Sequence, residues 1–342
     1  MAIVAALEIL VQGRDLSADQ AAAAMRQIMA GAASPAQIGA YLVALRMKGE
    51  SATEIAASAR VMRELAVPVD LPRERLIDIV GTGGDGASLF NVSTAASFVA
   101  AAAGARVAKH GNRSVSSKSG SADVLEAAGV NLALEPEQVA ECVRQLGVGF
   151  LFAPRHHGAM RHAIGPRREL GLRTMFNLLG PLTNPARAAR QILGVYDRRW
   201  LRPLAEVMRE LGSEHVLVIH ADDGLDEFSI AAATAVAELR AGVISEYRFD
   251  PQQAGIEGGS LAGLGVADAA QSLLLLRQAL SGRPGAASAI VALNAGAGLY
   301  VAGLADSIPA GVDRARQAMA DSSAERRFED FVAMTATFGN SA

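Results

Sequence analysis

The first part of the chain repeats one pattern of polar and apolar positions. In three places a Ser is followed three residues later by Gln or Glu and then by apolar residues at helical spacing, which is the pattern of a capping box. These pairs are Ser17 with Gln20, Ser34 with Gln37, and Ser51 with Glu54. They predict helices at about 18–30, 35–48 and 52–66. Because no strand pattern precedes residue 76, we expect residues 1–70 to form a small all-helical domain. Pro68 and Pro72 mark a linker at 67–73.

Beyond residue 74, short apolar runs alternate with helical patterns. The runs predict strands at about 76–80, 106–109, 148–152 and 215–220, and a hairpin of 236–239 with 243–249. Helices are expected between them at 92–103, 121–128 and 136–146, and near the end at 268–281, 284–302, 309–320 and 323–335. The expected fold class is α/β. Residues 74–342 form a larger domain with a central mixed sheet flanked by helices, and part of 160–190 joins the helical domain.

Composition and charge narrow the function classes. The 342 residues carry a formal net charge of −3, which gives no overall attraction to nucleic acid. Cys142 is the single cysteine, so an intramolecular disulfide and a Cys-rich metal site are excluded. The apolar start meets Glu8 early and has no basic leader, which indicates a helix and not a signal peptide. No apolar run is long enough for a membrane span. We expect a cytoplasmic enzyme.

A glycine-rich loop follows the first predicted strand, with the sequence GTGGDG at 81–86. Glycines let backbone N–H groups approach a phosphate closely, and the start of a following helix adds its positive dipole end. Asn91, Ser93 and Thr94 supply further polar groups at the predicted helix start, where they could equally act as helix caps. The loop matches neither the dinucleotide-binding nor the P-loop motif. An anion cradle and a plain tight connection are both open at this point.

A second polar segment, at 109–121, reads KHGNRSVSSKSGS. Lys109, Arg113 and Lys118 supply positive charge. Small polar contacts come from Asn112, Ser114, Ser116, Ser117, Ser119 and Ser121. Such a set suits a ligand with several phosphates. The alternative is a solvated surface loop, and a loop that covers phosphates would satisfy both interpretations.

A third group places four carboxylates within six residues at the end of the predicted strand 215–220. They are Asp222, Asp223, Asp226 and Glu227. Mg²⁺ prefers oxygen ligands and is commonly held by one or two carboxylates together with substrate phosphates. The acidic turn therefore complements the two candidate phosphate loops, although an isolated acidic turn is more often only solvated.

Histidine and arginine crowd the segment 156–173, which Gly158, Gly165 and Pro166 interrupt. The pattern is compatible with a hinge that carries an acceptor site. His156, His157 and His162 have no cysteine or acidic partner at ligand spacing, so a structural role is favoured over a zinc site.

Five motifs in a fixed order give the chain a resemblance to a known family. They are GTGGD at 81–85, NVST at 91–94, KHGNR at 109–113, RTMFNLLGPLTNP at 173–185 and GLDE at 224–227. Together they resemble the anthranilate phosphoribosyltransferases of tryptophan biosynthesis, over nearly the whole chain. The resemblance implies transfer of a phosphoribosyl group from phosphoribosyl pyrophosphate (PRPP) to anthranilate. It also implies two Mg²⁺ ions, and a homodimer formed through the N-terminal helical domain.

The resemblance also implies site residues, matched position by position. Those for PRPP are Gly81, Gly84, Asp85, Asn91, Val92, Ser93, Thr94, Lys109, His110, Gly111, Asn112, Arg113, Ser116, Ser117 and Ser121. Those for Mg²⁺ are Ser93, Asp226 and Glu227, and those for anthranilate are Gly81, Asn112 and Arg167. A guanidinium suits the last role because it meets a carboxylate through two parallel bonds. An ion pair with Glu169 is the alternative role for Arg167. No residue is assigned as general base.

Two positions depart from the family pattern. Leu89 stands where Thr is usual, so a hydroxyl contact to phosphate is lost or replaced by Ser88, and Gly158 stands where Pro is common. Two competing functions are a pyrimidine nucleoside phosphorylase, which would not need Asp226 and Glu227 for Mg²⁺, and a nucleic-acid binder, which would need a basic surface. The sequence pI of about 6.1 disfavours the second.

Overall fold

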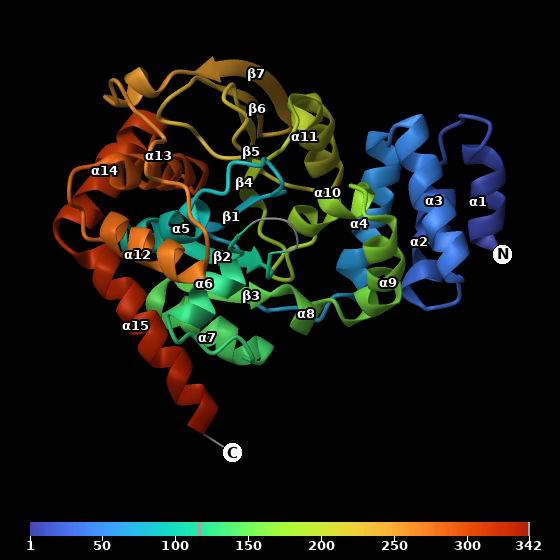
Figure 1. The fold of residues 1–342 in the computed structure, drawn as a ribbon, viewed down its shortest axis with the longest axis horizontal. Coiled ribbons are helices and arrows are strands. Elements are labelled where there is room, and N and C mark those ends of the chain that lie inside the picture. The colour runs from blue at the N-terminus through green and yellow to red at the C-terminus, as the bar shows by residue number, and fades with distance from the viewer. Residues whose placement is uncertain (115–117, 341–342) are drawn as a thin grey trace.

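The N-terminal helices begin where the sequence predicts. The computed structural model describes residues 1–114 and 118–340. In this part of the chain, α1 (Ala2–Leu10), α2 (Ala18–Met29), α3 (Pro35–Lys48) and α4 (Ala52–Leu65) gather at one end of the molecule (Figure 1). The hydroxyl of each capping Ser accepts a hydrogen bond from the backbone N–H three residues later, and that residue's side chain accepts one in return. All three predicted capping boxes are confirmed.

The described residues beyond this helical end build a seven-stranded sheet in the order β3-β2-β1-β4-β5-β6-β7. The parallel strands are β1 (Leu76–Gly81), β2 (Arg106–Gly111), β3 (Val148–Phe152), β4 (Arg190–Gly194) and β5 (His215–Ala221). The strands β6 (Thr234–Arg240) and β7 (Val243–Phe249) pair antiparallel. Ala241 and Gly242 join them with positive φ at both positions, as a tight hairpin requires. The predicted mixed sheet and hairpin are confirmed.

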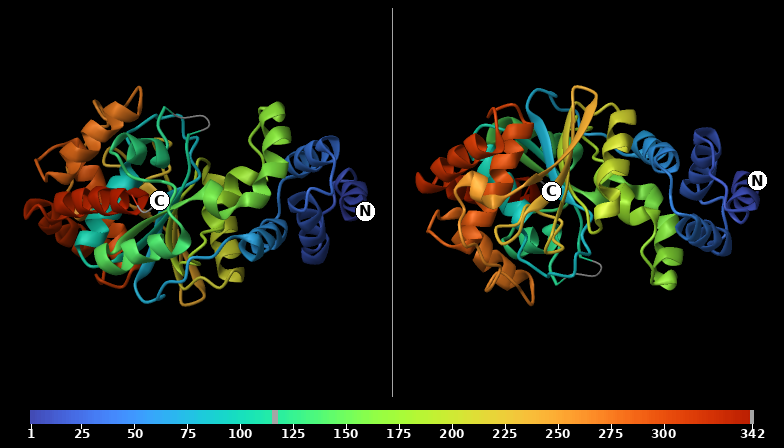
Figure 2. Two further views of the ribbon diagram at one scale, coloured as in Figure 1. Left: turned by 90° about the horizontal axis from the view of Figure 1, so that it is seen from below. Right: turned by 90° about the horizontal axis from the view of Figure 1, so that it is seen from above.

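Helices cover both faces of this sheet. On one face lie α5 (Val92–Ala102), α7 (Pro136–Leu146) and α13 (Ala286–Val301). Around them pack α6 (Ser121–Ala127), α12 (Ala269–Leu280), α14 (Ile308–Ala320) and α15 (Ser323–Thr337). The opposite face carries α11 (Leu201–Glu210), which touches β5, β6 and β7. Figure 2 shows the sheet between α1–α4 at one end and α12–α15 at the other.

Alternating side chains of the strands feed two hydrophobic cores. In β5, Leu217 and Ile219 belong to the core that includes α5 and α13. Val216 and Val218 point to the other face, into a core that includes α11 and the four N-terminal helices. Successive residues of a strand face opposite sides of a sheet, so the nearly continuous apolar run of β5 is what a doubly covered strand requires.

The segment 153–210 departs most from the sequence prediction. It contains β4 and α11, which we did not predict, and also α8 (Ala153–His156), α9 (Arg161–Leu170) and α10 (Met175–Leu182). The segment 156–173, whose pattern is compatible with a hinge, is largely helical, because α9 continues through Gly165 and Pro166. Proline removes one helical hydrogen bond, and here packing of α9 against α2 and α3 outweighs that loss.

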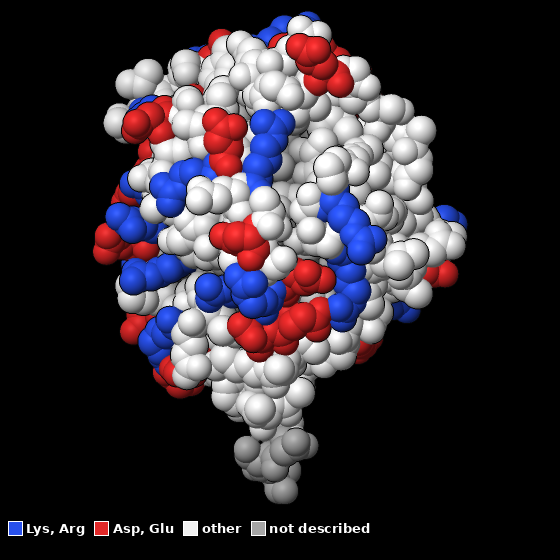
Figure 3. Space-filling view, turned by 90° about the vertical axis from the view of Figure 1, so that its left-hand side faces the viewer, with Lys and Arg blue, Asp and Glu red and all other residues white. Residues whose placement is uncertain are grey.

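The helices and the surface charges of the described residues bear on membrane and nucleic-acid binding. None of their helices has the length and apolar character needed to cross a membrane. Figure 3 shows the end of the molecule that carries the C-terminal helices, where acidic and basic side chains are interspersed. Among these helices Arg277 pairs with Glu329, and Arg316 with Asp313. This face offers no continuous basic surface of the kind that nucleic-acid binding requires.

Candidate active site

The predicted site residues lie where the order of the parallel strands reverses, next to β1. From β1 the chain builds outward through β2 and β3, whereas β4 and β5 extend the sheet on the other side of β1. In open α/β sheets, ligands bind beyond the carboxyl ends of the strands at such a switch point. The glycine-rich loop follows β1, the polar segment follows β2, and the acidic turn follows β5. The fold therefore brings the three candidate groups to one edge.

Two glycines make room for Asp226. A Cβ atom on Gly81 would overlap Asp226 Oδ2, and one on Gly194 would overlap the Asp226 carbonyl oxygen. Gly81 and Gly194 are partners across β1 and β4. Gly81 is thus needed for the seat of a carboxylate, in addition to any role near phosphate. Gly194 was missed, because nothing in the sequence links it to the distant turn that carries Asp226.

The glycine-rich loop is bonded to Asp226 through its backbone. Gly83, Gly84 and Gly86 have φ values of 65°, 80° and 80°, a conformation that favours glycine. The Gly83 N–H donates to Asp226 Oδ2 at 2.7 Å. The loop is therefore a shaped element fixed against the acidic turn.

Glu227 caps the helix that follows the loop. Its Oε1 accepts from the Ser93 N–H at 3.2 Å, in the first turn of α5. A carboxylate is favoured there by the unpaired N–H groups and the helix dipole. Asn91 occupies the N-cap position, but its side chain does not cap α5. The cap comes instead from a residue that is distant along the chain.

Asn91 instead joins a small polar network. Its Oδ1 accepts from Ser119 Oγ at 2.9 Å and from Ser272 Oγ at 2.7 Å, and its amide donates to the Ser119 carbonyl at 3.2 Å. Ser119 lies in the polar segment 109–121 that was predicted to suit phosphates, whereas Ser272 was not predicted as a site residue. Ser272 lies on α12, in a stretch of ordinary helical pattern that gives no indication of its contact with Asn91.

Lys109 lies at the centre of the cluster and is almost completely buried. Its ammonium donates to the Ile79 carbonyl at 2.7 Å and to Ser93 Oγ at 3.2 Å. Burial lowers the pKa of Lys109, and the carboxylates of Asp78, Glu227 and Asp226 oppose that shift. The lysine thus links β1 to the start of α5. The start of α5 is a suitable place for a bound phosphate.

The carboxylates carry more negative charge than the site neutralises. Burial, followed by repulsion from Asp85, raises the pKa of Asp226 to about 6. Burial and then the charge of Asp226 raise the pKa of Glu227 to about 8. Burial also raises the pKa of Asp85. Groups shifted in this way are stabilised by an added cation, and oxygen donors match the preference of Mg²⁺. The residues present thus fit a magnesium site.

The acidic side chains would need additional ligands to complete such a site. Within the described part of the chain, no group of three or more His, Cys, Asp or Glu is arranged to hold a metal ion. Mg²⁺ commonly keeps several waters and takes phosphate oxygens from its substrate. A site with two carboxylates suits that binding mode. Within the described residues, His156, His157 and His162 belong to no such group of three or more.

His110 and His157 form a buried pair. Their ring centroids are 5.1 Å apart. The His110 backbone N–H donates to Asp78 Oδ1, and its Nδ1 lies 3.1 Å from the Gly180 carbonyl. Burial lowers the pKa of both rings, that of His157 to about 4. Both imidazoles are therefore neutral at physiological pH. The pair connects the end of β2 to α10.

Several other predicted residues are committed to structure. The Arg113 guanidinium holds Glu126 of α6 through two bonds of 2.5 and 2.8 Å. A Cβ on Gly111 would overlap Ser121 Oγ, which itself donates to the Asn112 carbonyl. Val92 is a core residue, so only its backbone is available to a ligand. Ser116 and Ser117 lie outside the described residues.

Thr94 and Arg167 have unused polar groups. Thr94 Oγ1 is buried without a hydrogen-bond partner among the described atoms. Arg167 lies over the ring of Phe176, with 5.0 Å between guanidinium carbon and ring centroid. Within the described residues, no ion pair joins it to Glu169, the expected alternative partner. Burial lowers the pKa of Arg167, yet a guanidinium stays charged. An anionic ligand would supply the missing partner.

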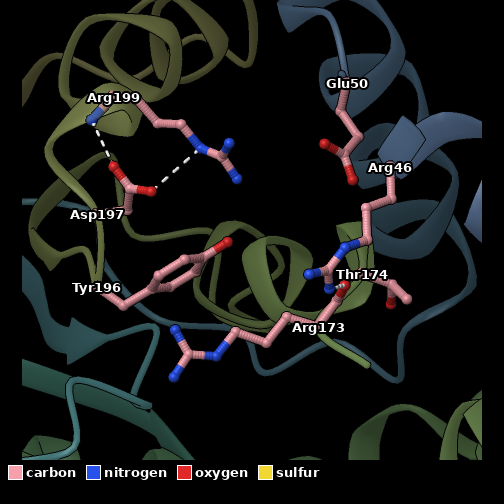
Figure 4. A pocket seen from close by; sticks show the side chains of 7 residues that line it. All are labelled: Arg46, Glu50, Arg173, Thr174, Tyr196, Asp197 and Arg199. Atoms are coloured by element: carbon pink, nitrogen blue, oxygen red, sulfur yellow. Dashed lines mark hydrogen bonds and ion pairs between the residues drawn. The ribbon is translucent and has the colours of Figure 1, made fainter. Parts of the chain in front are cut away.

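A cavity of about 210 Å³ lies beside the glycine-rich loop (Figure 4). Its lining residues are Arg46, Glu50, Arg173, Thr174, Tyr196, Asp197 and Arg199. It is separate from the cluster around Lys109, but Arg173 bonds the Gly84 carbonyl. Arg173 was recognised only as part of a motif, and Tyr196 was missed.

Comparison with known proteins agrees with this geometry. Residues 4–66 match the helical bundle domain of the glycosyl transferase family, and residues 73–325 match its a/b domain. The anthranilate phosphoribosyltransferase of Cellvibrio japonicus is 57% identical over 339 residues, which cover 98% of this chain and 99% of that relative. That of Methylococcus capsulatus is 56% identical over the full length of both. The chain belongs to the anthranilate phosphoribosyltransferase family.

Solved structures of this family share the whole architecture. The anthranilate phosphoribosyltransferase of Thermus thermophilus superposes with a TM-score of 0.92 at 45% identity, covering 97% of this chain and 99% of that one. The enzyme of Saccharomyces cerevisiae in complex with PRPP and Mg has a TM-score of 0.89 at 25% identity, with 98% of both chains covered. The recognised family and the predicted fold class are both confirmed.

The two departures from the family pattern have local structural roles. The Leu89 side chain packs against the hydrophobic core, so it replaces a polar group by an apolar contact. Its neighbour Ser88 has a φ of 50°, and the Ser88 carbonyl accepts from the Val266 N–H at 2.9 Å. Gly158 begins a 3-10 turn and has open space where a Cβ would lie. The Cβ of a proline at this position would therefore meet no neighbouring atom.

Proposed function

We propose that this protein transfers the 5-phosphoribosyl group of PRPP to the amine of anthranilate, in tryptophan biosynthesis. The products are N-(5-phosphoribosyl)anthranilate and pyrophosphate. The observation that carries this proposal is the convergence of Asp226 on the glycine-rich loop and of Glu227 and Lys109 on Ser93 at the start of α5, at the sheet's switch point. Family membership over the full chain supports the same reaction.

The reaction needs positioning and charge stabilisation more than covalent help. Pyrophosphate leaves as positive charge develops on the ribose, so the site must bind the leaving group and hold the acceptor in line. The loop N–H groups and Lys109 bind phosphate oxygens, and Ser93 and Thr94 add hydroxyl donors. The amine of anthranilate is already neutral at physiological pH. Its attack therefore requires no strong general base at the start.

Ser93, Asp226 and Glu227 would hold Mg²⁺, and we propose two ions, because the acidic turn and a diphosphate together offer more oxygens than one octahedral ion uses. When bound, magnesium neutralises charge on the departing pyrophosphate. Titration calorimetry with Mg²⁺ and PRPP together measures the ratio of ions to protein. A ratio of one would contradict the second ion.

Arg167, Asn112 and the Gly81 backbone are proposed to orient anthranilate. The guanidinium of Arg167, stacked on Phe176, would meet the anthranilate carboxylate. We expect Arg167→Ala to raise the KM for anthranilate by roughly tenfold or more and to leave the KM for PRPP near its original value. Exposed Arg168 on the same helix is the matched control, and Arg168→Ala should change neither constant. An effect of Arg167→Ala confined to PRPP would contradict the assignment.

The reaction itself is tested by mixing the protein with PRPP, Mg²⁺ and anthranilate and following the loss of anthranilate fluorescence. We expect a loss that stops when the metal is chelated. A nucleoside phosphorylase would instead consume a nucleoside and inorganic phosphate without needing Asp226 and Glu227, so the same samples are assayed for that activity. PRPP binding without loss of fluorescence would point to a different acceptor.

A homodimer through the N-terminal helices is also proposed. Val4 and Val11 of the α1 region are exposed apolar residues, 37% and 73% accessible in the single chain. Light scattering measures the mass in solution. Val4→Glu should shift the protein to a monomer, whereas the equally apolar but distant Leu274→Glu should not.

A further inference from the structure

Arg173 contacts the glycine-rich loop at Gly84, one residue after the Gly83 N–H that Asp226 accepts from. This residue lies between α9 and α10, and its guanidinium donates to the Gly84 carbonyl. The guanidinium also lies over the ring of Tyr196, 4.5 Å from the centroid (Figure 4). Stacking on an aromatic face restricts the orientation of an arginine side chain. The loop carbonyl therefore meets a donor with a fixed direction.

The backbone of Arg173 is held in turn by the helical end of the molecule. Arg46, near the C-terminal end of α3, donates to the Arg173 carbonyl. Figure 4 shows the two arginines meeting at one side of the cavity. A continuous series of contacts thus runs from α3 through Arg173 to Gly84.

Tyr196 fixes a second point of the same loop. Its backbone N–H donates to Thr82 Oγ1 at 3.1 Å, and the Thr82 N–H donates to the Gly194 carbonyl at 2.9 Å. The tyrosine therefore anchors Thr82 through its backbone and supports Arg173 through its ring. Gly84 has a φ of 80°, and a Cβ there would lie 3.0 Å from the Arg173 guanidinium. A side chain at position 84 would therefore crowd the guanidinium.

We propose that Arg173 is a positioning residue that sets the conformation of loop 81–86 and so aims the loop N–H groups at the diphosphate. Arg173 donates to the Gly84 carbonyl, and Asp226 accepts from the Gly83 N–H. With both anchors in place, the loop N–H groups are arranged before the ligand arrives, which lowers the entropy lost on binding. The ligand named here rests on the proposed function, whereas the effect on the loop does not.

The experiment compares Arg173→Gln, Arg173→Lys and the control Arg199→Gln. Arg199 lines the same cavity but bonds Asp197 and lies over Trp200. Hydrogen exchange of residues 82–87 is measured in the full-length, ligand-free protein. We expect exchange to rise roughly tenfold in Arg173→Gln, less in Arg173→Lys, and not at all in Arg199→Gln. Unchanged exchange in Arg173→Gln would overturn the proposal.

Kinetics then separate positioning from general destabilisation. Arg173→Gln should raise the KM for PRPP roughly tenfold with the KM for anthranilate and the melting temperature nearly unchanged. An equal increase in the KM values for PRPP and anthranilate would contradict the proposal that Arg173 positions the loop. Absence of turnover in the unsubstituted protein would instead contradict the proposed function, and the exchange result would still stand.

A second pair of variants serves if Arg173→Gln does not fold. Tyr196→Phe keeps the ring and the backbone bond and loses the hydroxyl that accepts from Trp200 Nε1. Tyr196→Leu loses the same hydroxyl and the ring, so the two variants differ in the ring. We expect the phenylalanine variant to retain the exchange rate of loop 82–87 and the leucine variant to increase it. The same rate in both would show that the stacked guanidinium does not fix the loop.

Discussion

The two halves of the acidic turn after β5 contain similar residues in different environments. Asp222 is exposed and pairs with Arg198 at 3.6 Å and with Arg248. Asp223 is also exposed and accepts from Ser229 Oγ at 2.6 Å. Further along the turn, Asp226 and Glu227 are partly buried and bond backbone N–H groups of the glycine-rich loop and α5. One pair belongs to the surface and the other to the site.

Apolar neighbours create this difference. Leu225 and Phe228 are almost completely buried and flank the second pair. Gly224, with a φ of 94°, turns the chain between the two pairs. Burial of the two apolar side chains draws Asp226 and Glu227 toward the sheet, while Asp222 and Asp223 stay exposed to solvent. The comparison teaches that the function of an acidic cluster depends on the hydrophobic residues that flank it.

The strongest test of the comparison removes each pair of charges in turn. Asp226→Asn with Glu227→Gln should abolish turnover at ordinary Mg²⁺, a loss of roughly 1000-fold or more, because the metal and its charge stabilisation are lost. Asp222→Asn with Asp223→Asn should leave turnover within about twofold, since exposed ion pairs contribute little. Steady-state rates at several Mg²⁺ concentrations measure both. Equal effects of the two double variants would contradict the distinction.

A smaller loss of activity is expected when the space that Gly194 leaves for Asp226 is filled and the charge of Asp226 is kept. A Cβ at Gly194 would overlap the Asp226 carbonyl oxygen. Gly194→Ala should lower kcat/KM by roughly 100-fold, which is typical when reacting groups move by about 1 Å. Gly165→Ala is the control, because its Cβ meets open space in the middle of a helix, and its activity should be unchanged. Full activity of Gly194→Ala would show that the seat is adaptable.

The pH dependence of stability is expected to show the smallest effect. The folded-state pKa values of Asp226, about 6, and Glu227, about 8, lie above the ordinary values of 3.8 and 4.5. The folded protein therefore binds more protons than the unfolded chain, and the stability that this uptake contributes below about pH 4 is lost as the pH rises to about 8.

Urea unfolding of the metal-free protein measures this loss. The free energy of unfolding should fall with pH more steeply in the original protein than in the variant with Asp226→Asn and Glu227→Gln. Saturating Mg²⁺ should reduce the slope, because it binds the charged carboxylates of the folded state. The variant with Asp222→Asn and Asp223→Asn should keep the original slope. Parallel curves for all three proteins would contradict the raised pKa values.

The sequence predicts those parts of the fold that depend on neighbouring residues. The capping boxes at Ser17, Ser34 and Ser51 are local, and so is the hairpin turn at Ala241 and Gly242, so each was found from its own pattern. β4 was missed because its short apolar run has no local feature that separates it from the surrounding loop. The continuity of α9 through Pro166 was missed because it depends on packing against α2 and α3.

The site divides in the same way. Lys109, Asp226 and Glu227 were singled out from residue type and motif, and the fold brings them together with Ser93. Gly194, Ser272 and Tyr196 could not be found, because each acts through a contact with a distant segment. Their residue types are ordinary, and only the paired sheet or the packed helix reveals the neighbour.

The cap that Glu227 provides to α5 has a consequence for the order of ligand binding. Glu227 Oε1 already accepts from the Ser93 N–H, so a cation that is coordinated through this oxygen shares it with the helix end. A free metal ion therefore competes with a helix end for Oε1, one of the two oxygen atoms of Glu227. A phosphate group removes this competition, because it can occupy the helix N-terminus itself. Cation and diphosphate should consequently enter as a unit, each making the other's place available, and affinity for either alone should be weak.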